Sequence, residues 1–393
     1  TYWSTARAGS PTAPSSKPRH RISTAAGTNT TTGAVKISTV GGPITLWAGS
    51  DGSGVIDLEN YNILDSKTAG STGGGDITLG GNTTAATGNA LKPAGPVVTA
   101  SGDAIQLGSS LSITNGLQIL GRGGKVYIGG KTTGATSTDS GVEYYPGLTI
   151  NAGEVEIFGQ TAAGSTVNNT AAGIFAAAYN TRSDSVSGTI TATDSYLAVT
   201  DAITLTALSG SDYAMMLGNQ SPITLRTTGD MAGIKVSGDT TDASGSGLFI
   251  GNATIKSTSG NISLDSAGDI ATLGTDSSSN IRSIALGDSS TSGSITISSA
   301  LPSFYSASFN TSGQVFVEPQ VGAASFTAAT TFPSATTTFS GRETGLFVGG
   351  ENGNSATVTA AAAASIAGPI MYWAGTLNIN SAQTVSVDGE RLN

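Results

Sequence analysis

The stretch Asp76-Ile77-Thr78-Leu79-Gly80-Gly81 alternates apolar and polar side chains and then ends in a pair of glycines. The same short pattern returns at Lys125–Gly130, Glu154–Gly159, Asn261–Leu264 and Ser294–Ile297. Strict alternation places every second side chain on one face, so each copy predicts a half-buried β-strand. One such strand buries too little apolar surface to be stable by itself. Many of them stacked in register can share one core, so we expect a β-solenoid.

The spacing between these strands along the sequence is irregular. If Leu79, Ile128 and Ile157 occupy equivalent positions, they are 49 and 29 residues apart. The two spacings differ by about 20 residues, which is the length of one coil in repeats of this type. We therefore expect coils that carry irregular loop insertions, and not a repeat of fixed length.

Composition favours an all-β chain. The 393 residues include 55 glycines, and charged residues make up only 11% of the chain. Gly, Ser, Thr, Asn and Asp suit tight corners, whereas Val, Ile and Leu suit strands. A hydrophobic fraction of 37% with so few charges argues against intrinsic disorder. The formal net charge of −9 argues against nucleic acid and anionic membranes as partners, because both require clustered Lys and Arg.

The chain contains no cysteine. A secreted protein without cysteine must be stabilised by burial and by hydrogen-bonded ladders instead of disulfides. The longest uncharged stretch, Ser355 to Val387, is interrupted by Pro369, Gly375 and Asn378. A transmembrane helix needs about 20 predominantly apolar residues. We therefore do not expect the chain to span a membrane.

Three segments differ in composition. Residues 1–33 are rich in Pro and Ser, contain His20 within a small basic cluster, and are expected to form an extended arm or linker. Residues 34–300 are expected to form the regular β-helix coils. Residues 301–393 are expected to continue the β-helix with looser coils that are richer in phenylalanine, and we expect these rings mainly to fill the core.

Patterns that would carry catalysis are weak. His20 is the only histidine, and it lies in the arm. Glu154 and Glu156 are two residues apart, so they share one face of a strand, and Glu143 is expected to lie near them. This is the best acidic patch of the sequence, and we interpret it as a solvated face. We expect no catalytic residues.

Patterns that would bind a metal ion or a cofactor are equally weak. Asp239 and Asp242 supply two carboxylates to one loop, without the ligand spacing of a calcium loop. The run Gly73-Gly74-Gly75 lacks the following helix and lysine that would bind a phosphate. We therefore expect no metal ligand, no cofactor-binding residue and no cofactor.

Five stretches share the rhythm of one known kind of repeat: Gly42–Gly52, Gly74–Gly81, Leu111–Gly130, Gly141–Gly159 and Gly260–Ile270. They resemble the large secreted adhesins of the filamentous haemagglutinin type, which Gram-negative bacteria export by two-partner secretion. The resemblance covers most of Ala34 to Ile297. It implies a right-handed parallel β-helix that acts as a surface stalk, adhesin or matrix filament.

Two classes of function remain. The first is a non-enzymatic extracellular protein of the bacterial cell surface that forms a rigid rod, as part of an adhesin or a self-assembling filament. Its expected partners are identical subunits or further repeats of the same chain, end to end, together with carbohydrate or a cell surface. The alternative is a β-helical carbohydrate-active enzyme, a polysaccharide lyase or hydrolase, which needs acidic and basic side chains that converge on adjacent coils.

A third possibility is a flat, threonine-rich face that binds ice or crystals. Such a face requires threonines in register on successive coils. The irregular coil lengths argue against this register.

Overall fold

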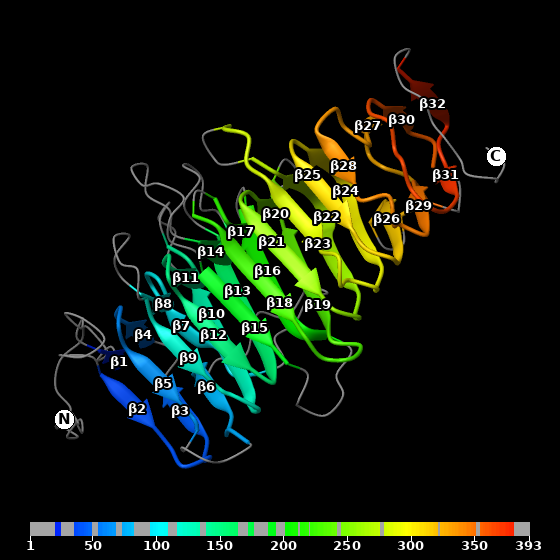
Figure 1. The fold of residues 1–393 in the computed structure, drawn as a ribbon. Helices are drawn as coiled ribbons and strands as arrows, with labels where there is room; N and C mark the ends of the chain where they lie inside the picture. Colours follow the sequence, from blue (N-terminus) through cyan, green and yellow to red (C-terminus); the bar gives the residue numbers. More distant parts are fainter. Residues whose placement is uncertain are drawn as a thin grey trace, which may run out of the picture.

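The computed structural model is an all-β solenoid, in which strands follow one another in sequence order from one end of a rod to the other (Figure 1). All pairings between its strands are parallel, and one isolated antiparallel bridge joins Thr275 and Ile281. The described residues contain no helix. The expected all-β parallel β-helix is confirmed. The structure describes residues 20–24, 35–48, 54–67, 73–81, 95–108, 116–133, 139–163, 172–176, 188–193, 201–210, 213–219, 221–241, 245–275, 279–320, 323–350 and 354–380.

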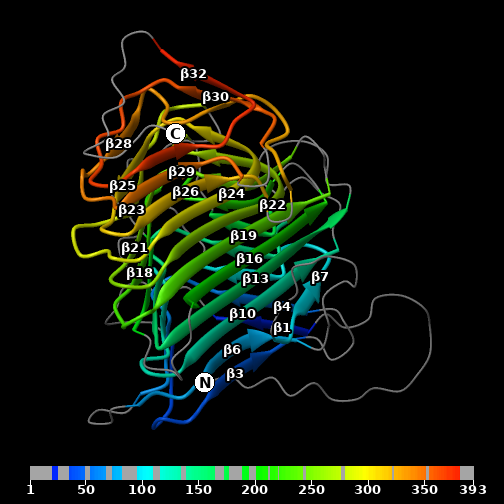
Figure 2. The same ribbon diagram turned by 90° about the vertical axis from the view of Figure 1, so that its right-hand side faces the viewer.

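Each coil contributes strands to three faces. The first face is turned toward the viewer in Figure 2, where its strands lie side by side along the rod. A short strand, β7 (Val98–Ala100), pairs with the end of β10 on this face. The strands of the first face are β3 (Ile44–Trp47), β6 (Ile77–Gly80), β10 (Lys125–Thr132), β13 (Glu154–Ala163), β16 (Asp201–Gly210), β19 (Gly233–Thr240), β22 (Ile262–Leu273), β24 (Ile295–Phe304), β26 (Gln314–Glu318), β29 (Gly345–Val348) and β31 (Ile370–Tyr372).

The second face belongs to the same hydrogen-bonded sheet, because β22 and β24 are long enough to pair on both faces. Its other strands are β1 (His20–Ser23), β4 (Gly54–Leu58), β8 (Ile105–Leu107), β11 (Val142–Tyr144), β14 (Ile174–Ala176), β17 (Tyr213–Leu217) and β20 (Ser246–Ile250). Beyond β24 lies a separate sheet of β27 (Thr330–Thr331), β30 (Thr357–Ala360) and β32 (Thr376–Ile379).

The third face is a ten-stranded sheet of its own. It is made of β2 (Lys36–Ser38), β5 (Ile63–Asp65), β9 (Gln118–Leu120), β12 (Thr149–Ala152), β15 (Gly188–Ala192), β18 (Ile223–Thr227), β21 (Ala253–Ser257), β23 (Ile284–Gly287), β25 (Ala307–Asn310) and β28 (Thr337–Phe339).

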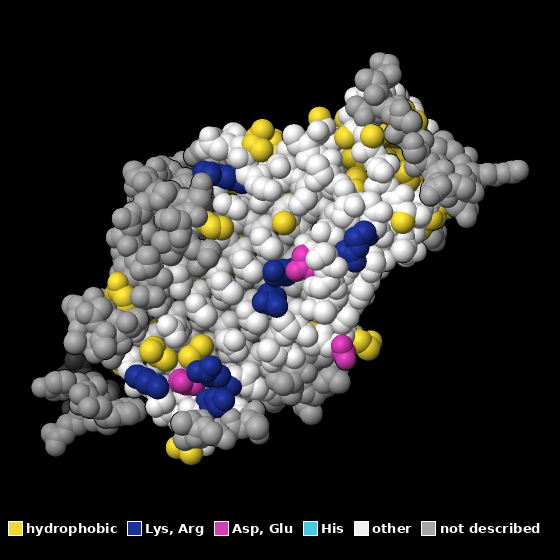
Figure 3. Space-filling model, viewed as in Figure 1, with side chains coloured by type: hydrophobic (Ala, Val, Ile, Leu, Met, Phe, Trp, Pro, Cys, Tyr) yellow, Lys and Arg dark blue, Asp and Glu magenta, His cyan; other side chains and the backbone are white. Residues whose placement is uncertain are grey.

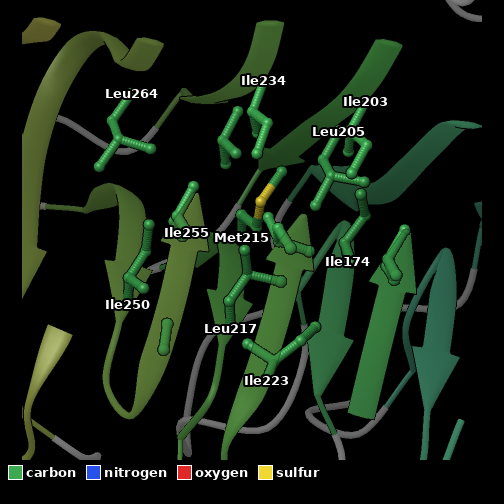
Figure 4. Close-up of a cluster of buried hydrophobic side chains, with 14 of the residues drawn as sticks. Ile174, Ile203, Leu205, Met215, Leu217, Ile223, Ile234, Ile250, Ile255 and Leu264 are labelled. Carbon is green, nitrogen blue, oxygen red and sulfur yellow. The ribbon is translucent and has the colours of Figure 1, made fainter. Parts of the chain in front are cut away.

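The core consists of columns of apolar side chains that point inward from the three faces and meet along the axis (Figure 4). In the close-up, Ile203 comes from the first face, Met215 from the second and Ile255 from the third. Full burial of one such side chain stabilises a fold by about 1.5–3 kcal/mol. The longest column takes one buried residue from each coil: Ile44, Ile77, Val126, Val155, Ile203, Ile234, Ile262, Ile295, Val315, Leu346 and Ile370.

The strand register confirms the equivalence that the sequence predicted. Leu79 is the partner of Ile128, and Ile128 is the partner of Ile157. The spacing of 49 residues in the first pair and 29 in the second therefore leads to neighbouring positions on one face. Extra residues are accommodated between the strands, so they change the length of a coil without changing its register.

The corner that leads into the first face explains part of the glycine content. A Cβ atom on Gly124 would lie 2.5 Å from the carbonyl oxygen of Gly75, and one on Gly293 would lie 2.1 Å from the carbonyl oxygen of Gly260. Real Cβ atoms do not approach backbone this closely, so only glycine fits these positions without a backbone shift. The close approach lets successive coils stack at the spacing of a parallel sheet, about 4.8 Å.

The two ends of the chain depart from simple coil repetition. Within the expected arm, His20–Ser23 forms β1 and pairs with Gly54–Asp57 of β4, so the solenoid includes part of that segment. At the other end, phenylalanines of residues 301–393 enter the core: Phe309 packs in a stacked arrangement on Phe339, with 5.4 Å between ring centroids. Residues 1–19 and 25–33 lie outside the described residues.

Candidate functional site

The acidic patch expected from the sequence is divided between two faces. Glu154 and Glu156 project from β13 on the first face, whereas Glu143 lies on β11 of the second face. Lys125 of β10 lies beside the first two, with its Nζ 2.8 Å from Oε1 of Glu154 and 2.7 Å from Oε2 of Glu156. The structure therefore does not form the three-glutamate patch, and a lysine that sequence reasoning did not connect to it balances part of its charge.

The lysine remains charged in this arrangement. Burial lowers the pKa of Lys125, but its hydrogen bonds and charge attraction to Glu154 and Glu156 outweigh burial and raise it. An ammonium group of one coil that lies between two carboxylates of the next coil stabilises the stacking of those coils. We interpret this trio as part of the scaffold.

A different acidic group, which we call the carboxyl cluster, forms on the second face from Asp57, Asp103, Asp139 and Glu143. Asp57 and Glu143 are in one outward column, because both are register partners of Gln106 on β8. Asp103 precedes β8, and its Oδ1 accepts a hydrogen bond of 2.7 Å from the backbone N–H of Ser140. The charges of Asp139 and Asp57 both act on Asp103, and that of Asp103 acts on Glu143.

Two members of the carboxyl cluster have strongly raised pKa values. Burial is the main cause for Asp103, whose pKa rises to about 6 although the hydrogen bond from Ser140 lowers it. Burial and the charge of Asp103 raise the pKa of Glu143 to about 8, against a lowering hydrogen bond from Tyr145. Near neutral pH the cluster therefore combines a protonated Glu143 with an ionised Asp103, one group to donate a proton and one to accept it.

The other candidate residues from the sequence do not come together in a site among the described residues. Asp239 of β19 and Asp265 of β22 have pKa values raised first by burial, and Lys235 lowers that of Asp265. Asp242 and the side chain of His20 lie outside the described residues. Over the residues that the structure describes, no group of three or more His, Cys, Asp or Glu could hold a metal ion.

The glycine run before β6 packs against other coils. A Cβ on Gly74 would lie 2.2 Å from the carbonyl oxygen of Gly121, and one on Gly75 would lie 2.3 Å from the backbone of Gly42. These glycines are required by the close approach of backbone segments at a corner. Their backbone faces protein, as expected for a structural role.

Threonines do stack in register on the third face, although the irregular coil lengths argued against it. Thr149, Thr189, Thr224 and Thr254 are successive register partners on β12, β15, β18 and β21, and each is half-buried. The register survives because insertions lie between strands. The column places a hydroxyl group at each strand spacing, about 4.8 Å.

Comparison with known proteins identifies no relative: no protein-family model, no curated protein and no solved structure matches the chain. Among the described residues, no helix of sufficient length and apolarity to traverse a bilayer occurs. The function must therefore be argued from the geometry of the solenoid and its three faces.

Proposed function

We propose that the chain is a non-enzymatic, extracellular structural protein of a bacterial cell surface, whose solenoid forms a rigid rod within an adhesin or a self-assembling filament. One observation carries the proposal: a single buried column continues through eleven coils, from Ile44 to Ile370. A core of this kind resists bending because every coil is hydrogen-bonded and packed to the next. Most of the described chain is thus used to build length.

The mechanism follows from the regular outer surface of such a rod. Side chains that point outward in one column repeat at about 4.8 Å. A long array of weak contacts can hold a surface firmly, because each contact after the first forms at a high effective concentration. Carbohydrate or a cell surface is the partner that such an array suits.

Identical subunits or further repeats, joined end to end, are the other proposed partners. Among the described strands, β31 pairs only with β29, and β32 pairs only with β30. A strand with one unpaired edge offers backbone donors and acceptors that another strand can pair with. This supports continuation of the solenoid by more of the same structure.

The proposal can be tested by attaching the protein to beads and measuring their retention on bacterial or host cell layers under flow. Ile157→Asp places a charge inside the solenoid, where Ile157 is 2% exposed, and should abolish retention by disrupting its coil and the adjoining ones. Thr204→Asp, an outward change on the next coil, is the matched control and should retain the beads. If wild-type beads do not adhere and the purified protein is not rod-shaped by electron microscopy, the proposal is wrong.

The carboxyl cluster favours a second candidate, the carbohydrate-active enzyme. A protonated carboxyl group beside an ionised one is the combination that polysaccharide hydrolases use. Incubation with a panel of polysaccharides, followed by measurement of new chain ends, tests it. Activity that is lost in Glu143→Gln and kept in Glu154→Gln would establish the enzyme, and absence of new chain ends over the panel would contradict it.

A further inference from the structure

The charges on the third face differ from those on the rest of the chain. Figure 3 looks onto this face, where most of the visible Lys and Arg side chains gather in two groups, each beside an acidic side chain, with neutral polar surface between the groups. One group lies over β2, β5 and β9, and the other over β18, β21 and β23. The trio of Lys125, Glu154 and Glu156 lies on the first face, and the carboxyl cluster lies on the second. A chain with a net charge of −9 therefore presents one basic face.

The proximal basic group surrounds Asp65, at the end of β5. Lys36 Nζ lies 3.9 Å from Oδ2 of Asp65, and Arg122 Nε lies 3.4 Å from its Oδ1. Lys67 follows β5, and its backbone N–H donates a hydrogen bond to the same carboxylate. Two cationic side chains thus meet at one aspartate, which leaves an excess of positive charge at this end of the face. Lys36 is also well exposed, with 55% of its side chain accessible.

The distal basic group likewise surrounds one aspartate, Asp288. Lys256 Nζ lies 3.5 Å from Oδ2 of Asp288, and Arg342 Nη1 donates to the Asp288 backbone carbonyl and to Asn310. Arg226, the exposed register partner of Lys256, makes no ion pair with the described acidic residues. Partial burial raises the pKa of Asp288, but hydrogen bonds from Ser290 and the charge of Lys256 outweigh it and lower the pKa. Asp288 is therefore ionised, and this group also keeps an excess of positive charge.

Hydroxyl and amide groups fill the surface between the two basic groups. Thr149, Thr189 and Thr224 form one outward column, and Asn151 and Thr191 form the column beside it. Three strand steps separate β9 from β18, so the two basic groups are about 14 Å apart along the rod. The outward Thr and Asn side chains of these strands can both donate and accept hydrogen bonds.

We propose that the third face binds an acidic linear polysaccharide, with the two basic groups contacting its carboxylate or sulfate groups and the threonine strip contacting its hydroxyls. Arginine suits this role because its planar guanidinium can pair with an oxyanion through two hydrogen bonds. The proposal rests on the rod function proposed above and names the class of its surface ligand.

Nucleic acid is the other polyanion to consider, and the face suits it less well. Single strands are held largely by bases stacking on aromatic side chains. The outward columns from Gln118 of β9 to Asn310 of β25 contain no aromatic residue. Asp230, exposed at the corner after β18, adds a negative charge at the edge of the face. A flexible, hydroxylated chain with spaced anionic groups matches the surface better than a closely charged backbone.

The test is binding of fluorescein-labelled oligogalacturonate to the full chain, followed by fluorescence anisotropy at low and raised salt. Wild type should bind, and binding should weaken as salt rises. Arg226→Glu/Lys256→Glu should weaken binding about tenfold or more, and the neutral pair Arg226→Gln/Lys256→Gln by less. Thr189→Val, which removes one hydroxyl at constant shape, should weaken binding by about two- to tenfold.

Lys131→Glu on β10 of the first face is the control, because it makes one charge reversal of the same kind away from the third face and should leave binding unchanged. Labelled malto-oligosaccharide of equal length should not bind. Equal loss of binding in Lys131→Glu, no binding by wild type, or tighter binding of labelled oligo(dT) would each overturn the proposal. Bead adhesion is measured separately, so a rod that adheres without binding oligogalacturonate would refute only this inference.

Discussion

The coils of the middle and those of the C-terminal part solve the same packing problem with different side chains. Between β10 and β21, the columns of the core are mainly aliphatic, with Tyr144 as an aromatic member, and neighbouring coils differ by small changes such as Ile157 beside Leu205. From the end of β24 onward, aromatic rings join the aliphatic columns in the core. Phe304, Phe309 and Phe332 lie in mutual contact, with centroids 4.6–6.5 Å apart and tilted or perpendicular planes.

The difference shows two ways to keep coils in register. Aliphatic columns need only similar volume in each coil, because branched side chains pack without a preferred mutual angle. Rings pack best at particular angles, so each ring restricts its neighbours. Outside the core, Phe316 and Phe347 stack at 5.0 Å, and Phe347 stacks on Trp373 at 5.9 Å, which extends the aromatic order to the surface. We expect a core substitution to lower the free energy of unfolding less in the middle coils than in the C-terminal part.

The largest effect should come from removing a ring at the centre of the aromatic group. Phe309 is 1% exposed and contacts three other rings, so Phe309→Ala should lower the free energy of unfolding by about 3–5 kcal/mol. Urea unfolding followed by fluorescence measures it. Phe316→Ala, on the outer surface, is the control, and an equal loss in both variants would contradict the inward assignment.

A rise in pH should destabilise the coils of the carboxyl cluster and leave the aromatic coils unaffected. The pKa of Glu143 is about 8 in the folded chain, against an ordinary value of 4.5. Between these values the folded state keeps a proton that the unfolded state has released, so stability falls as pH rises through this window. The slope is at most about 1.4 kcal/mol per pH unit for one group.

Glu143→Gln should flatten this pH dependence, and Glu154→Gln, which removes a carboxylate paired with Lys125, should not. Hydrogen exchange of β11 and of β28 at pH 6 and pH 8 separates the two regions. Equal responses in both strands would show that the effect does not arise at the carboxyl cluster.

Substitution of the glycines at the corner that leads into the first face should destabilise the fold to the same extent in both regions. Gly124→Ala and Gly293→Ala each place a methyl group against the backbone of the preceding coil, and we expect a loss of about 1–3 kcal/mol for each. Gly102→Ala is the control, since the nearest atom to its Cβ would be 4.0 Å away. Thermal unfolding of the three variants would show whether the corner, unlike the core, is common to the whole rod.

The smallest effect is expected inside the aliphatic columns. Ile150→Val removes one buried methylene between Ile119 and Ile190, and should cost about 0.5–1.5 kcal/mol. Phe339→Leu at the end of the same face serves as the aromatic counterpart. Urea unfolding measures both losses of unfolding free energy. A larger loss for Ile150→Val than for Phe339→Leu would contradict the expected difference between the two regions.

The strands and their register were predictable from sequence because both depend on local patterns. Alternation identified β6, β10 and β13, and the equivalence of Leu79, Ile128 and Ile157 required only the spacing of those patterns. The alternating pattern of a strand is set by its own residues, so a single sequence is enough to see it.

The carboxyl cluster could not be predicted in the same way. Its members, Asp57, Asp103, Asp139 and Glu143, come from three coils whose lengths differ, and no local pattern states which loops bring them together. The pairing of Lys125 with Glu154, in contrast, follows from the predicted register, because the same 29 residues separate Lys125 from Glu154 and Ile128 from Ile157. Irregular insertion lengths argue against a threonine column, yet the strands preserve the register of Thr149, Thr189, Thr224 and Thr254 because the insertions lie between them.

Because insertions leave the strand register intact, distance along this rod is independent of distance along the sequence. Val155 and Ile203 are register partners on adjacent coils although they are 48 positions apart in the sequence. Ile295 and Val315 are also register partners, and they are only 20 positions apart. A peptide inserted into the connection between β14 and β15 would therefore enlarge one coil and leave the register of the following coils unchanged. The spacing of the coils along the axis is therefore constant, whereas the length of the connections between strands varies.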